Sequence, residues 1–581
     1  MKKISILTLL VAALGFYNPS TACTNYIITK GASADGSVMI SYAADSHIRY
    51  GELYYIPGGP QPAGSMYKIF DRGTMKYLGE IPQPAFTYTV IGFMNEHQVA
   101  IGETTFGGVS GLEDTTGMID YGSLMFLALQ RAKTAREAIK VMAELVDKYG
   151  YFSSGESFSI GDANEAWIFE MIGKGTQMVT DKKTGKAYNK NKGAVWVAIR
   201  IPDGYISAHA NQARITTFPL ANGKTSITSK NLDKIFNPEV NVVYSSDVIS
   251  FAKEKGLYKG KDEEFSFSDT YNPVTFEGAR FCEIRVWSMF KNVNKDMWSY
   301  FDYAKGENLK HRMPLYIKPD HKLTPQDLMA NYRDHLEGTE LDMSKDPGAG
   351  PFGLPYRWRP LTWKVNGKEY FNERATATQQ TAFSFIAQLR SWMPDPIGGI
   401  FWIGVDDAAT TVYVPIYAGI RKAPESYTQG NGDMLTYSET SAFWTFNKVA
   451  NFTYLRYDLM VQDVKKVQKE LEDKYAALIP DVDKTALKIY SENPERARDF
   501  VSTFSIATAN STVAQWNDLF HFLLVKYIDG NVKKEKDGVF EKNPYGFVPN
   551  PKQPGYPEWW LKQLVKETGN KFELPEAAAS H

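Results

Sequence analysis

Two strand-like runs, Cys23-Thr24-Asn25-Tyr26-Ile27-Ile28-Thr29-Lys30 and Ser37-Val38-Met39-Ile40-Ser41-Tyr42, are separated by Gly31-Ala32-Ser33-Ala34-Asp35-Gly36. β-Branched and aromatic residues on both sides of an Asp-Gly pair predict an antiparallel hairpin. Cys23 would then lie at the open end of the first strand, where its side chain is held rigidly. Ala43-Ala44-Asp45 follows the second run, and antiparallel pairing returns Asp45 toward the start of the first.

The residues before Cys23 have the layout of a secretory signal peptide. Lys2 and Lys3 precede an apolar stretch, residues 4–16, and a polar stretch that ends in Ser20-Thr21-Ala22. Small residues therefore occupy the minus-three and minus-one positions of a cleavage site. Cleavage after Ala22 would give Cys23 both a thiol and a free α-amine, which titrates near pH ~8 and can act as the base for its own side chain. We therefore predict a leader at 1–22 and a nucleophile at Cys23.

Two other interpretations of Cys23 stay open. It can be a structural cysteine, bonded to Cys282, the only other cysteine, as an exported protein would permit. It can also be the acylated cysteine of a lipoprotein, with its amine capped and no base left for catalysis. The usual lipobox has a large aliphatic residue three positions earlier, whereas this chain has Ser20.

Composition argues against several classes of function. The net charge is -1, and no stripe of Lys and Arg residues is present that could bind the phosphates of a nucleic acid. Nucleic acid is therefore not an expected partner. Beyond the leader, no apolar run is long enough to span a bilayer, so we expect a soluble protein in the periplasm or outside the cell. The histidines form no His-Glu-x-x-His or Cys-His cluster, and no Gly-x-Ser-x-Gly elbow occurs. We therefore expect neither a metal nor a cofactor.

The remaining pattern predicts an α+β fold with helices packed outside stacked sheets. Thr134, with Glu137 three residues later, opens a helix that ends at Gly150. Past residue 450 the pattern is helical, so we expect a catalytic domain at 23–450 and a helical C-terminal extension at 451–581 packed on it. Further elements are predicted as strands at 88–93, 99–105, 157–160, 166–171, 194–199, 383–390, 399–404 and 411–417, and helices at 124–132, 486–490, 495–504 and 514–526.

Polar residues outside the hairpin supply further candidates. Asn211 lies in the polar segment 200–214, and a side-chain amide is suited to stabilising the oxyanion of an acyl-transfer intermediate. Arg280 and Arg285 lie in a strand-like run at 276–287, where buried guanidinium groups would need partners. Glu103 or Glu156 could recognise a free amino group.

Several motifs occur together and in order along the chain. They are Cys23-Thr24, the turn at 32–37, Asn95-Glu96, the helix start at 134–139, Ser154-Gly155-Glu156-Ser157-Phe158, His209-Ala210-Asn211-Gln212, and 280–287. With them the chain resembles the cysteine-type N-terminal nucleophile (Ntn) hydrolases, and among these the dipeptidases of the dipeptidase A / PepD family, related to bile salt hydrolase and penicillin V acylase. The resemblance implies an Ntn-hydrolase αββα four-layer sandwich, an exposed N-terminal cysteine, and hydrolysis of dipeptides without a metal.

The resemblance also implies roles for four residues. Cys23 would be the nucleophile and, through its amine, the base, Asp45 would orient that amine, Asn211 would serve the oxyanion hole and Arg280 would be the active-site arginine. Two positions depart from the family. Tyr42-Ala43 stands where relatives often carry Arg-Asn, and Thr105 stands where the bile salt relatives have a second oxyanion asparagine.

The function expected from this resemblance is that of an exported dipeptidase acting through a thioester at Cys23. The alternatives are an Ntn amidase acting on N-acyl amides, such as conjugated bile acids or penicillin V, and a non-catalytic, lipid-anchored binding protein. The sequence does not fix the side-chain specificity or whether the chain forms a homo-oligomer.

Overall fold

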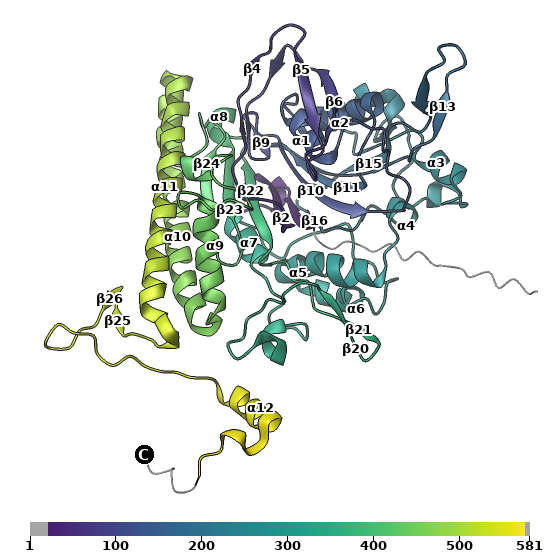
Figure 1. Cartoon of the computed structure of the whole chain (residues 1–581). Coiled ribbons are helices and arrows are strands. Elements are labelled where there is room, and N and C mark those ends of the chain that lie inside the picture. The colour runs from purple at the N-terminus through teal and green to yellow at the C-terminus, as the bar shows by residue number, and fades with distance from the viewer. Residues whose placement is uncertain (1–20, 576–581) are drawn as a thin grey trace, which may run out of the picture.

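The computed structural model describes residues 21–575, and most of this chain forms one body built on two large sheets (Figure 1). The α+β class predicted from the sequence is confirmed. The predicted leader lies outside the described residues except for Thr21 and Ala22. None of the helices between residues 21 and 575 is long and apolar enough to cross a membrane.

The first sheet contains the predicted hairpin. Strands β1 (Thr21–Ile28) and β2 (Val38–Ser46) pair antiparallel, with Cys23 opposite Ala44 and Ala22 opposite Asp45. On its other edge β1 pairs with β16 (Ile206–His209). The sheet has seven strands in the order β19-β16-β1-β2-β22-β23-β24. Its other members are β19 (Tyr316–Ile317), β22 (Thr381–Leu389), β23 (Ile400–Val405) and β24 (Val414–Tyr417).

The second sheet has nine strands in the order β17-β18-β15-β12-β11-β10-β9-β8-β3. Its central strands form where the sequence predicts them, at β10 (Ala100–Gly107), β11 (Gly155–Gly161), β12 (Ala166–Gly173) and β15 (Ala194–Arg200). The predicted strand at 88–93 is shorter, because the chain turns after β8 (Val90–Ile91). The outer members are β17 (Ser226–Thr228), β18 (Val242–Tyr244), β9 (Met94–Asn95) and β3 (Tyr55–Ile56).

The two sheets contact each other through β1 and β2 on one side and β10 and β11 on the other. Every residue of β2, β11, β12, β22 and β23 is buried, so both faces of these strands are covered. A Cβ atom on Gly102 would lie only 2.3 Å from Asn25 Oδ1. The glycine therefore lets the sheets approach closely beside Cys23, where Asn25 Nδ2 donates a hydrogen bond to the carbonyl oxygen of Glu103.

Helices α1 (Tyr121–Leu129) and α2 (Ala135–Tyr149) form the predicted pair. The Thr134 side chain accepts a hydrogen bond from Glu137 N, and Gly150 ends the helix with a φ of 80°, as the capping signals indicate. Helix α2 contacts β11, β12 and β15, and α1 contacts β10. On the seven-stranded sheet, α5 (Ile284–Val293) contacts β16 and α7 (Pro325–Tyr332) contacts β22.

The strand predicted at 276–287 is wrong. This segment is a turn of π-helix, Gly278–Glu283, that continues into α5. Ile284, Trp287 and Phe290 recur at helical spacing and are fully buried, so tertiary packing decides the structure against the strand preference of the aromatic and β-branched residues.

Between residues 442 and 527 the chain forms three helices, α9 (Ala442–Tyr454), α10 (Tyr457–Glu492) and α11 (Pro494–Tyr527). The short helices predicted here join into two long ones. Pro480 lies inside α10 without ending it, and Asn493 caps α11, with Pro494 at its first position. Helix α11 packs on β24, where Tyr417 N donates to Ser505 Oγ at 3.1 Å.

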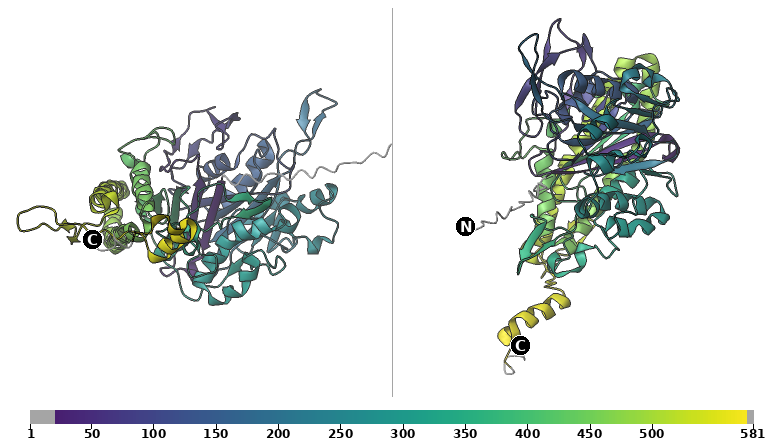
Figure 2. Two further views of the ribbon diagram at one scale, coloured as in Figure 1. Left: turned by 60° about the horizontal axis from the view of Figure 1, so that its bottom comes forward. Right: turned by 90° about the vertical axis from the view of Figure 1, so that its right-hand side faces the viewer.

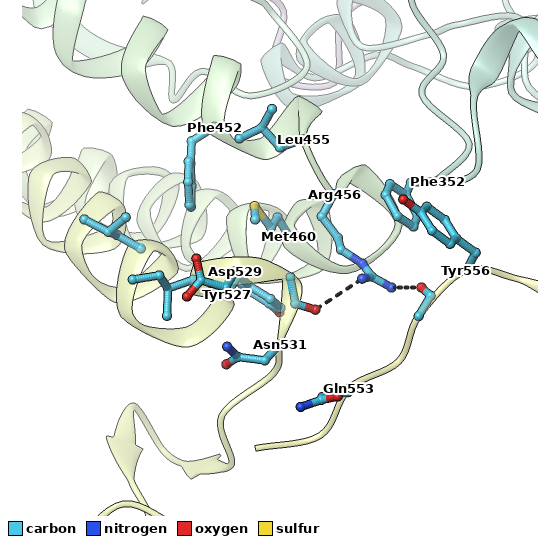
Figure 3. Close-up of a pocket in the computed structure, with 14 residues that line it drawn as sticks. Phe352, Phe452, Leu455, Arg456, Met460, Tyr527, Asp529, Asn531, Gln553 and Tyr556 are labelled. Carbon is cyan, nitrogen blue, oxygen red and sulfur yellow. Dashed lines mark hydrogen bonds between the residues drawn. The ribbon is translucent and has the colours of Figure 1, made fainter. Parts of the chain in front are cut away.

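The segment after α11 runs away from the body to α12 (Glu558–Thr568), which has no buried residue and stands apart in Figure 1 and in the right-hand view of Figure 2. Arg456 ties the C-terminal segment to the body (Figure 3). It donates to the carbonyl oxygens of Gly530 at 3.3 Å and Gly555 at 2.9 Å, and its guanidinium stacks on Phe352. A hollow at this junction is lined by α9 to α11 and the C-terminal segment, and shares no residue with the environment of Cys23.

Candidate active site

Cys23 is 8% exposed and presents three groups to one buried cluster. Its backbone nitrogen donates to Asn211 Oδ1 at 2.9 Å, and its carbonyl oxygen accepts from Arg285 Nη1 at 2.6 Å. Its Sγ carries a free thiol that lies 3.6 Å from the Tyr42 hydroxyl and 3.9 Å from Glu103 Oε1. The pairing of β1 between β2 and β16 fixes these directions.

Asn211 follows β16 in a left-handed conformation with a φ of 53°, which asparagine tolerates better than most residues. Its backbone N–H donates to Thr104 Oγ1 at 2.7 Å, and its Nδ2 donates to the carbonyl oxygen of Thr105 at 2.6 Å. Its Oδ1 accepts from both Cys23 and Arg285. The structure thus brings Asn211 to Cys23 and leaves one Nδ2 hydrogen available for a ligand.

Asp45 lies on β2 with its side chain fully buried. It accepts hydrogen bonds from Arg374 and from Thr381 Oγ1, the latter at 2.7 Å. Burial raises the pKa of Asp45, while Arg374 and Thr381 oppose that shift. Its charge in turn helps to raise the pKa of the Cys23 thiol, so Asp45 acts on the site across the strand pair. Arg374 was not found from the sequence, because it lies 329 residues away along the chain.

The structure brings Arg285, and not Arg280, into contact with Cys23. Arg280 is bound through its guanidinium to Glu373, at 2.6 and 2.8 Å. Arg285, one residue into α5, is buried and bridges the Cys23 carbonyl oxygen and Asn211 Oδ1. Both arginines lie in the segment singled out from the sequence, but only the helical geometry distinguishes them.

Two buried acidic side chains act on the thiol, Glu103 at 3.9 Å and Glu156 from farther away. The Tyr42 hydroxyl donates to Glu103 Oε1, and Thr105 Oγ1 donates to Glu156 Oε2 at 2.9 Å. Burial and the charge of Glu103 raise the pKa of Glu156. Burial, followed by the charges of Glu103 and Asp45, raises the pKa of the Cys23 thiol well above its usual value. The thiol is therefore protonated at neutral pH and needs a base to react.

The two departures noted in the sequence both lie at the site. Tyr42 contacts the thiol directly, and the carbonyl oxygen of Thr105 holds the Asn211 amide. Within residues 21–575 no group of three or more His, Cys, Asp or Glu side chains is arranged to hold a metal ion.

A buried cysteine held by an amide, an arginine and backbone hydrogen bonds defines a candidate cysteine hydrolase. A model of "Peptidase family C69" matches residues 52–470, which include Asn211 and Arg285 but begin after Cys23. The chain therefore belongs to peptidase family C69, and it is a cysteine-type peptidase, an enzyme that hydrolyses peptide bonds.

Similar proteins carry related names. A "Probable dipeptidase" of Latilactobacillus sakei is 24% identical over 547 residues, covering 90% of this chain and 98% of that protein. A "Probable dipeptidase B" of Streptococcus pyogenes serotype M1 is 23% identical over 562 residues, covering 92% and 97%. A "Probable dipeptidase" of Salmonella dublin is 24% identical over 420 residues, covering 69% and 82%.

Proposed function

We propose that this protein is an exported dipeptidase of the N-terminal nucleophile class, with Cys23 as its nucleophile. The names of the relatives, which span most of both chains, support a dipeptide substrate. The observation that carries the mechanism is that Cys23 directs its nitrogen and its thiol into the same buried cluster, toward Asn211 and Glu103 respectively.

Cleavage after Ala22 would supply the missing base. In the uncut chain the Cys23 nitrogen is an amide, which has no basic lone pair. Once freed, it becomes an amine on the same residue as a thiol whose raised pKa requires proton removal. Asp45, opposite Ala22 in the strand pair, orients the resulting ammonium.

The reaction then proceeds through a thioester. The thiol proton moves to the amine, directly or through water, and sulfur adds to the peptide carbonyl carbon while the π electron pair moves to oxygen. Asn211 Nδ2 stabilises this oxyanion, and Arg285 holds Asn211 in place through Oδ1. The C–N bond breaks, the leaving amino acid takes the proton from the ammonium, and water hydrolyses the thioester with the same amine as base. Arg285, rather than Arg280, takes the part of the active-site arginine.

The charge beside the thiol favours a dipeptide over an N-acyl amide. A dipeptide places its ammonium next to the scissile carbonyl, where Glu103 Oε1 lies 3.9 Å from Cys23 Sγ and can accept a hydrogen bond. The apolar acyl group of a bile acid or penicillin V would instead leave Glu103 buried without a cation.

We propose the architecture of an Ntn hydrolase for the same reasons. The two sheets, with α1 and α2 against one and α5 and α7 against the other, support an αββα sandwich of the Ntn type. We propose a leader at 1–22, a catalytic domain at 23–450 and a helical extension at 451–581, with export to the periplasm or the outside of the cell.

A panel of dipeptides tests this proposal with three proteins: the mature form beginning at Cys23, its Cys23→Ser variant, and a form with one extra residue before Cys23. We expect hydrolysis only by the first. Full activity of the extended form would refute the amine as base. Mass spectrometry of the exported protein gives a second test, because an acylated Cys23 amine would rule out the mechanism.

A further inference from the structure

A cavity lies at the end of the seven-stranded sheet, where β22 begins, β23 ends and helix α9 packs against β23 (Figure 1). Its volume is about 250 Å³, which is the space of about eight water molecules and enough for one amino acid. One wall residue, Ser46, pairs with Thr21 across the β1–β2 hairpin, and another, Thr381, donates a hydrogen bond to Asp45. The cavity therefore borders the candidate active site.

Two buried side chains of the cavity lack hydrogen-bond partners. Gln380 is 5% exposed, and within residues 21–575 neither its Nε2 nor its Oε1 has a partner. Asp406 is 2% exposed, and in the same part of the chain its Oδ2 has no partner, whereas Asn447 Nδ2 donates to its Oδ1 at 2.9 Å. A buried amide or carboxylate without a partner destabilises the fold. These side chains therefore offer one donor group and two acceptor atoms to an occupant of the cavity.

The backbone places Gln380 and Asp406 close together. In the register of β22 and β23, Phe383 lies opposite Val405, and Asp406 N, one residue further, donates to the carbonyl oxygen of Ala382 at 2.9 Å. Gln380 comes two residues before Ala382, so its Cα lies about 7 to 8 Å from that of Asp406. A ligand whose donor and acceptor groups are separated by only two carbon atoms can therefore contact both side chains.

The charges around the cavity favour a ligand with both an anionic and a cationic group. Arg359 and His47 line the cavity. Burial and the charge of Arg374 lower the pKa of Arg359 to about 10, and burial and these two guanidinium groups lower the pKa of His47. Positive charge is therefore in surplus here, and an anion would relieve it. Asp406 has the opposite need, because burial raises its pKa to about 7 and a cation would stabilise its charged form.

An α-amino acid supplies the complementary groups. Its ammonium can donate to Asp406 Oδ2 and Gln380 Oε1, and its carboxylate can accept from Gln380 Nε2. Phe443, Met434 and Trp358 form apolar walls for its side chain. We propose that this cavity is a binding site for a free α-amino acid with an apolar side chain, such as leucine. Under the proposed function such an amino acid is a product of the enzyme, but the site itself does not depend on that function.

The test compares three ligands by isothermal titration calorimetry on the full-length protein. Leucine carries both charged groups, leucinamide lacks the carboxylate, and N-acetylleucine lacks the ammonium. We expect leucine to bind at least about 10-fold more tightly than either of the others, which is the effect of one charged hydrogen bond. Equal binding of the three, or no binding of leucine at millimolar concentration, would refute the site.

Variants locate the bound amino acid. Gln380→Met removes both polar atoms at similar volume, and Asp406→Asn removes the charge and keeps the shape, so each should weaken leucine binding at least about 10-fold. Gln130→Met is the matched control and should change nothing. Gln130 is 3% exposed, and its Oε1 has no partner in the described chain, but it lies at the end of α1, outside the cavity. If the two cavity variants bound leucine as tightly as the wild type, or if only Glu103→Gln weakened it, the amino acid would bind elsewhere and the inference would be wrong.

A measurement at the mouth of the cavity guards against misfolded variants. Trp358 is 65% exposed, so Trp358→Phe should fold normally, and leucine should change the tryptophan fluorescence of the wild type but not that of this variant. The same fluorescence change in Trp358→Phe would contradict the assignment. These results are separate from catalysis. A protein that binds leucine but hydrolyses no dipeptide keeps the site and loses the proposed function, and one that hydrolyses dipeptides without binding leucine loses the site alone.

Discussion

Replacing Asn211 with aspartate isolates the oxyanion role of this residue. The change keeps the shape of the side chain and its tolerance of the left-handed backbone, since both residues adopt a positive φ more readily than most. It removes the one group that can donate to an oxyanion, Nδ2, and keeps an oxygen for Cys23 N and Arg285.

The structure separates the expected effect on catalysis from that on stability. In the aspartate variant an oxygen replaces Nδ2 opposite the carbonyl oxygen of Thr105, so the hydrogen bond is lost and two buried acceptors face each other, which costs about 2 to 3 kcal/mol. A charged hydrogen bond to Arg285 offsets part of this loss, so the free energy of unfolding should fall by about 1 to 2 kcal/mol. Loss of an oxyanion donor costs about 3 to 4 kcal/mol in the transition state, so kcat should fall about 100- to 1000-fold.

Steady-state hydrolysis of a dipeptide gives kcat and KM, and urea unfolding gives the stability of the same preparation. Asn95→Asp is the matched control, because Asn95 is equally buried but donates to the carbonyl oxygens of Leu129 and Ala132, away from the thiol. It should lose stability and keep kcat. If Asn211→Asp retained more than a tenth of the wild-type kcat, Asn211 would not be the oxyanion donor.

Three further predictions concern the arginines, the acid beside the thiol and a buried histidine. Arg285→Met should lower kcat more than 100-fold, whereas Arg280→Met should change kcat less than threefold; equal losses would contradict the assignment to Arg285. Glu103→Gln should raise KM for dipeptides and, by removing a charge that raises the thiol pKa of Cys23, shift the acid limb of the kcat/KM profile to lower pH; a profile that stays in place would disprove this. Burial lowers the pKa of His209 to about 3, so below about pH 6.5 the unfolded chain binds a proton that the folded chain does not. The contribution of neutral His209 to the free energy of unfolding is therefore complete above about pH 6.5 and is lost as the pH falls toward 3. His209→Gln should reduce the difference in urea midpoint between pH 7 and pH 4.5, and unchanged midpoints would refute the argument.

Local signals predicted the elements that local interactions build. The β1–β2 hairpin follows from its Asp-Gly turn and branched residues, and α2 follows from Thr134 and Gly150. The prediction for the α5 segment was wrong, because its aromatic and β-branched residues favour a strand and packing against β16 makes it a helix.

The same distinction between local and distant interactions applies to the residues of the candidate site. Cys23 was found because its chemistry depends on its neighbours in sequence, and Asp45 because a hairpin brings it back. Arg285 and Arg374 contact residues more than 200 positions away along the chain. Local sequence patterns do not reveal contacts between residues so far apart. Their roles, like those of Cys23, Asp45 and Asn211, stay predictions until the variants are assayed.

Strand β1 begins at Thr21, two residues before Cys23, and this limits when the proposed cleavage can occur. Ala22, 8% exposed, is already paired with Asp45 across the hairpin, so the bond proposed for cleavage lies inside a hydrogen-bonded strand. A protease needs access to that backbone, and a buried strand with both neighbours in place does not give it. Cleavage after Ala22 would therefore have to precede the closure of the hairpin. A chain that folded first would keep its nucleophile masked, which would protect the cell that makes it from a peptidase acting before export.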